Sequence, residues 1–169
     1  ALIAATCASL DNIVVEESST TVIPERSIVE ELVGEIAFLG FEGFDIEQSE
    51  EFQNAGYSKD QIDAVRIIQL DLDIEAPSDG DFDFLDSIAF FAEADGLPRI
   101  EIASLAEVPQ GVQSLSLVLS DENLVDYVVA PSVTFTTEAT GLRPESETTI
   151  RADVAFDVDV NVDGALGCQ

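Results

Sequence analysis

The chain has 169 residues, 35 of them Asp or Glu and only 6 Lys or Arg, which gives a formal net charge of −29 and no histidine. Without histidine, neither a Ser-His-Asp or Cys-His nucleophile system nor a His-ligated zinc or haem site can form. Without clustered positive charge, nucleic acids and anionic membrane surfaces are excluded as electrostatic partners.

The acidity does not indicate disorder. Disordered acidic chains are poor in apolar residues, whereas this chain is 46% hydrophobic with a mean hydropathy of +0.21. We therefore expect one domain over residues 1–169, with the carboxylates on its solvent side and a general affinity for cations. No apolar run approaches the roughly 18 residues of a membrane-spanning helix, so no transmembrane segment is expected.

The first ten residues, ALIAATCASL, carry no charge. They resemble the tail of a signal-peptide apolar region, and the chain does not begin with Met, so we expect export and numbering that starts after processing. Residues 1–12 form an apolar N-terminal arm that either completes its own sandwich or adds as a strand to a neighbouring subunit. The candidate assembly residues of this arm are Leu2, Ile3, Ala4, Ala5 and Leu10.

Cys7 and Cys168 are the two cysteines of the chain. In an exported protein they are expected to form a disulfide, which closes a loop of about 160 residues and contributes roughly 5 kcal/mol on the chain-entropy model. The bond can lie within one chain, or between subunits if the arm is donated. Two alternatives stay open, namely two free thiols in a reducing compartment and lipidation of Cys7.

Alternation of apolar and polar residues predicts that most of the chain forms strands with one buried face. The clearest cases are residues 68–75 and 150–162, the second long enough to bend or to serve two sheets. Shorter strands are predicted at residues 13–23, 88–94, 99–105, 115–119 and 132–140. Seven or eight strands separated by Gly, Pro, Asp and Ser predict an all-β, antiparallel, immunoglobulin-like β-sandwich.

Helical signals are confined to the N-terminal third. Residues 27–30 and 58–61 both match the capping box, in which a serine and a Glu or Gln satisfy free backbone N–H groups. A further short helix is predicted at residues 49–54, closed by Gly56. Between these signals, residues 38–44 (FLGFEGF) are interpreted as a plug that closes one end of the sandwich, with a ligand pocket as the alternative.

Asp79, Asp81 and Asp83 surround Gly80 in a turn that follows an acidic strand. Several carboxylates on one loop can supply the six to eight oxygen ligands of Ca²⁺, so these three residues are a candidate calcium site, with a solvated acidic turn as the alternative. No other cofactor is expected. Residues 159–164 match the start of an EF-hand loop, but the alternation there predicts a strand and the chain ends before the required Glu.

Carboxylate pairs of the kind that a glycosidase uses carry almost no information in a chain with 35 acidic residues. An unrecognised carboxylate hydrolase therefore ranks behind the non-enzymatic functions. With no Trp and only two Tyr, a cleft that stacks sugar rings is also poorly provided for.

Three stretches resemble exported or lipoprotein-type bacterial proteins that have no characterised activity. They are residues 58–68 (SKDQIDAVRII), 82–103 (FDFLDSIAFFAEADGLPRIEIA) and 127–160. The resemblance implies export from a bacterial cell and an all-β domain, and it carries over no functional residue.

Taken together, these patterns favour a secreted structural or interaction protein of the cell surface. The most concrete hypothesis is a subunit of an extracellular filament or surface layer, built by strand addition of the arm to copies of itself. The alternative is a monomeric envelope protein whose acidic loops bind calcium, other divalent cations or a partner.

Overall fold

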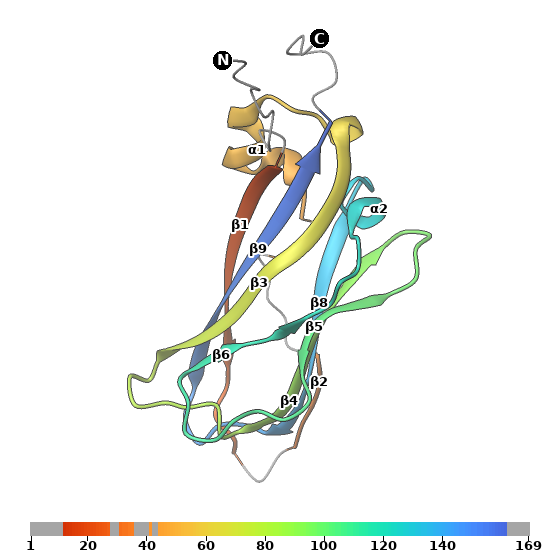
Figure 1. Cartoon of the computed structure of the whole chain (residues 1–169). Helices are drawn as coiled ribbons and strands as arrows, with labels where there is room; N and C mark the ends of the chain where they lie inside the picture. Colours follow the sequence, from red (N-terminus) through yellow and green to blue (C-terminus); the bar gives the residue numbers. More distant parts are fainter. Residues whose placement is uncertain (1–11, 28–30, 36–40, 42–43, 162–169) are drawn as a thin grey trace, which may run out of the picture.

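A computed structural model describes residues 12–27, 31–35, 41 and 44–161. The described chain is mainly β-structure, with two short helices and short 3₁₀ turns (Figure 1). The strands are β1 (Asn12–Ile23), β2 (Glu31–Glu35), β3 (Ile62–Ala76), β4 (Leu85–Ala94), β5 (Ile100–Leu105), β6 (Ser114–Ser116), β7 (Val118–Leu119), β8 (Val133–Leu142) and β9 (Thr148–Val160). The predicted all-β class is confirmed.

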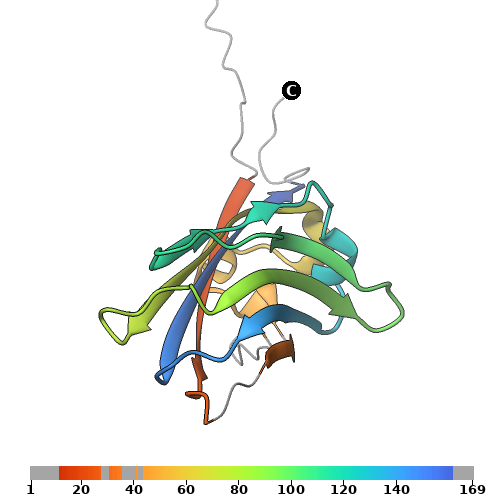
Figure 2. The ribbon, with the colours of Figure 1, turned by 90° about the horizontal axis from the view of Figure 1, so that it is seen from below.

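The strands form two antiparallel sheets, one with the order β1-β9-β3-β6 and the other with the order β2-β8-β4-β5-β7. Successive strands cross between the sheets at both ends of the chain, so β1 and β9 pair in one sheet while β2 and β8 pair in the other. Figure 2, a view from below, shows the two sheets as the two layers of the molecule.

This strand order is that of a jelly roll, in which two Greek keys are wrapped around each other. The immunoglobulin-like assignment is not confirmed. In an immunoglobulin sandwich the last two strands lie side by side in one sheet, whereas β8 and β9 lie in different sheets here. Alternation along a strand reports which face is buried and is the same for both topologies, so it does not distinguish them.

The core lies between the inner faces of the two sheets, and β9 shows how the sequence builds it. Residues 150, 152, 154, 156, 158 and 160 of β9 are all buried, as the alternation predicted. The described strand begins two residues before the predicted one, at Thr148, and ends at Val160. Three phenylalanines from separate segments meet in this core, with ring centroids 5.4–5.8 Å apart: Phe44, Phe135 and Phe156.

Helix α1 (Glu50–Ala55) confirms the predicted helix at residues 49–54. The Ser49 hydroxyl accepts a hydrogen bond from the N–H of Phe52, and Gly56 ends the helix with φ +76°. The capping box at residues 58–61 is also present, and the Gln61 side chain accepts from the Ser58 N–H at 3.1 Å. It opens only the 3₁₀ turn η3 (Lys59–Gln61), because β3 begins at the next residue.

Of the capping signal at residues 27–30, only Ser27 is among the described residues, and no helix is present where the description resumes at residue 31. The chain instead forms β2 at Glu31–Glu35, which pairs with β8 from Glu138 to Leu142. Pairing with a distant strand outweighs a local helix signal here, because tertiary contacts routinely override propensity.

Candidate functional site

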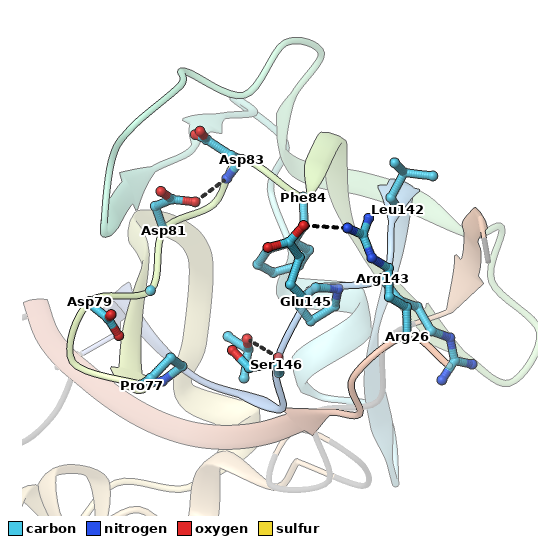
Figure 3. A pocket seen from close by; sticks show the side chains of 13 residues that line it. Arg26, Pro77, Asp79, Asp81, Asp83, Phe84, Leu142, Arg143, Glu145 and Ser146 are labelled. Carbon is cyan, nitrogen blue, oxygen red and sulfur yellow. Dashed lines mark hydrogen bonds and ion pairs between the residues drawn. The ribbon is translucent and has the colours of Figure 1, made fainter. Parts of the chain in front are cut away.

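A cleft of about 440 Å³ opens at the end of the sandwich where β3, β8 and β1 finish, the lower end in Figure 1. Three chain connections line it: Arg26 after β1, residues 77–84 between β3 and β4, and residues 142–148 between β8 and β9 (Figure 3). Asp79, Asp81 and Asp83 all contribute to its wall, so the acidic turn singled out from the sequence lies at this cleft.

Hydrogen bonds to the backbone groups of the acidic turn hold it in place. The Gly80 N–H donates to the Pro77 carbonyl at 3.0 Å, and the Phe82 N–H donates to the Val112 carbonyl at 2.9 Å. The side-chain amide of Gln113 donates to the carbonyls of Ser78 and Gly80 at 3.1 and 2.8 Å. Phe82 is fully buried and anchors the turn to the core.

Two of the three carboxylates accept hydrogen bonds from backbone N–H groups, one within the turn and one from another loop. Asp81 accepts from the N–H of Asp83 at 3.1 Å (Figure 3). Asp83 accepts from the N–H of Gly111. Among the described residues, no group of three or more Asp, Glu or Cys side chains is arranged to hold a metal ion. The structure therefore brings the three aspartates to one cleft without assembling them as a ligand set, and calcium binding stays a prediction.

The cleft also holds residues that the sequence analysis missed. Arg26 forms an ion pair with Glu145 at 2.5 Å between Nη2 and Oε1, and its N–H donates to the Pro144 carbonyl at 3.0 Å. Arg143 lines the same cleft. Two of the six basic residues of the chain are thus placed beside its acidic turn. No local signal joins Arg26 to Glu145, because 119 positions separate them and only the return of β8 and β9 brings them together.

The outer face of the first sheet is acidic around one arginine. The Arg151 guanidinium lies 2.8 Å from Asp153 and 3.4 to 3.5 Å from Glu75 and Asp73. The hydrogen bond and charge of Asp153, supported by the other two carboxylates, raise the pKa of Arg151.

The second sheet repeats this arrangement. Arg99 lies 2.6 Å from both Glu93 and Glu138, with its guanidinium carbon 3.8 Å from the centre of the Phe91 ring. Desolvation lowers the pKa of Arg99, but Glu138 and Glu93 outweigh it and raise that pKa overall. No charged side chain is among the buried residues of the described chain, so the expected solvent-side placement of the carboxylates is confirmed for this part.

The phenylalanine-rich segment 38–44 is described at two positions only. Phe41 is 2% exposed and Phe44 is 7% exposed, and Phe44 packs on Phe135 and Phe156. Both side chains are part of the core, as the plug interpretation requires. Neither of them lines the cleft beside Asp79, Asp81 and Asp83.

The remaining predicted site residues lie outside the described residues. These are the arm residues Leu2, Ile3, Ala4, Ala5 and Leu10, together with Cys7 and Cys168. The arm, the disulfide and its alternatives therefore stay predictions.

The fold and this surface define an acidic all-β protein with two antiparallel sheets. No protein-family model matches the chain, and no curated protein is similar to it. Within the ranges that the structure describes, no helix has the length and apolar character needed to cross a membrane.

Proposed function

We propose that this protein is an exported, non-enzymatic structural or interaction protein that assembles with copies of itself. The most concrete form is a subunit of an extracellular filament or surface layer, in which residues 1–10 of one subunit add as a strand to the next. A disulfide of Cys7 with Cys168 would then lie within a subunit or link neighbours.

One observation carries this proposal. The arm precedes β1 directly in the sequence, and β1 is an edge strand that pairs with β9 alone among the described residues. An uncharged segment joined in sequence to an edge strand can add as a strand to the sheet of another subunit. The carboxylates on both outer faces favour a soluble assembly, because like charges oppose stacking of one sheet on another.

The proposal predicts filaments from the full chain and none from a variant that lacks residues 1–10. Negative-stain microscopy and light scattering on both proteins make the test, at a salt concentration that screens the acidic surface. Paired variants sharpen it: Leu10→Asp is expected to abolish assembly because it adds charge to the arm, whereas Leu10→Val should preserve it. Compact monomers from the full chain would contradict the proposal.

The alternative is a monomeric envelope protein whose acidic loops bind calcium or a partner. The cleft favours it, because Asp79, Asp81 and Asp83 line one wall and Arg26 and Arg143 line another. If calcium binds there, millimolar Ca²⁺ should raise the melting temperature relative to a chelator, and Asp79→Asn should reduce that rise. Asp63→Asn, on β3 outside the cleft, is the matched control. An unchanged melting temperature would exclude a calcium role.

A further inference from the structure

The edge strands of the two sheets differ in how well they are protected against pairing with a strand of another chain. The first sheet ends in β1 and β6, and the second ends in β2 and β7. Strands β6, β7 and β2 contain three, two and five residues, whereas β1 contains twelve. Short edge strands are one way in which proteins avoid unwanted pairing, and β1 lacks this protection.

Strand β1 is also low in charge for this protein. Its twelve residues, NIVVEESSTTVI, include two carboxylates, and the last six are uncharged and rich in β-formers. Val14 and Val22 are exposed at 45% and 53% on its outer face. Two polar side chains of the outer face reach toward β9, where Asn12 donates to Asp157 and Ser18 to Asp153. Among the described residues, β1 pairs with another strand along one edge only, the edge that faces β9.

We propose that β1 pairs antiparallel with β1 of a second copy, across a two-fold axis that passes through Ser18. This register places Val14 opposite Val22, Glu16 opposite Thr20 and Ser18 opposite its own copy. Directly opposed residues share a sheet face, so the exposed valines of both copies cover one another. The first sheets of the two copies would then form one continuous sheet, with the two β1 strands in its centre; in the single copy β1 is the outermost strand of this sheet (Figure 1).

Charge selects this register. Directly opposed residues must lie on the same face of the sheet, so the two-fold axis has to pass through a residue. The registers that pair nearly all of β1 are those with the axis at residue 17 or at residue 18. An axis at residue 17 would set Glu17 against its own copy, and a like-charge pair directly opposite is destabilising. Glu17 already has its pKa raised by burial and by the charge of Glu51. With the axis at Ser18, no carboxylate directly opposes another.

The proposed contact is separate from the arm and goes beyond the proposed function, because it uses only described residues and closes as a pair. Sedimentation equilibrium of the full chain in high salt should show a monomer–dimer equilibrium. Ser18→Glu sets two carboxylates against each other at the axis and should weaken this equilibrium about tenfold or more, whereas Ser18→Thr should preserve it. The melting temperatures of both variants must be measured alongside, because Ser18→Glu also replaces the hydrogen bond to Asp153 with a like-charge pair inside each copy.

Cross-linking tests the register itself. Under mild oxidation, the full chain with Ser18→Cys should give a dimer in which peptide mapping finds a disulfide between position 18 of one copy and position 18 of the other. Thr20→Cys is the control, because its new thiol faces Glu16 of the second copy and should not link to itself. A monomer at all concentrations, or a dimer without the disulfide at position 18, would overturn the inference.

Deleting residues 1–10 distinguishes the two proposals. The β1 dimer should survive this deletion, because every residue that it uses lies in β1. A dimer that is lost when residues 1–10 are deleted, and whose dissociation constant is unchanged by Ser18→Glu, would refute β1 pairing.

Discussion

Replacing Gly141 by alanine is expected to destabilise the protein by about 3 kcal/mol or more. Gly141 lies in β8 between β2 and β4, opposite Leu32 and Leu85, with φ +145°. A Cβ at this position would lie 2.1 Å from the Phe84 carbonyl oxygen and 2.9 Å from the Leu85 Cα. Both obstacles are backbone atoms, so no side chain can move aside to relieve the clash.

The local register explains why a glycine is needed here. The pairing of β4 with β8 shifts between Leu85 and Ser87, and the Leu142 N–H donates to the Phe84 carbonyl at 2.8 Å. This bulge draws the start of β4 over Gly141 and brings Phe84 and Leu142 to the rim of the cleft. A larger residue would therefore disturb both the centre of the second sheet and the shape of the cleft.

Gly96→Ala is the matched control. Gly96 also has a positive φ of +80°, but a Cβ there meets no atom within 4 Å. Its substitution should cost about 1 kcal/mol, from backbone strain alone. Urea unfolding of both variants in the same high-salt buffer measures the difference. Equal losses at the two positions would show that β4 does not approach Gly141 as closely as described.

The sequence predicted those parts of the fold that depend on neighbouring residues. The buried face of β9 follows from strict alternation, and the caps of α1 follow from Ser49 and Gly56. The same local reasoning failed at β2, where pairing with β8 determines the structure. It also left the topology open, since jelly-roll and immunoglobulin-like sandwiches share one pattern of buried faces.

The cleft shows the same division. The aspartates of residues 79–83 stand together in the sequence, so their position on one loop could be predicted. The other charged residues of the cleft could not be predicted, because Arg26 and Glu145 come from opposite ends of the chain. Nor could it be predicted that Asp83 accepts the N–H of Gly111, since Gly111 comes from a distant loop. Contacts between distant segments decide what an acidic turn can bind.

Phe156→Ala is expected to cost about 3–5 kcal/mol in the free energy of unfolding. Phe156 is 1% exposed at the centre of the first sheet, opposite Val15 of β1 and Ile67 of β3. Its ring lies 5.4 Å from Phe135 of the second sheet and 5.8 Å from Phe44. Truncation would remove a contact between the two sheets and leave a cavity that the surrounding strands cannot close.

Two further variants separate this contribution from a general effect of mutation. Phe156→Leu keeps part of the volume and should cost about 1–2 kcal/mol, and Val22→Ala, on the exposed face of β1, should change stability by less than about 0.5 kcal/mol. Denaturant unfolding in screening salt gives all three values, at protein concentrations low enough to keep the chain monomeric, because Val22 belongs to the proposed β1 contact. If Phe156→Ala were as mild as Val22→Ala, the three phenylalanines would not join the sheets, and segment 38–44 would lose its anchor at Phe44. If the expected order holds, the aromatic cluster stabilises the sandwich against the repulsion of a chain with net charge −29.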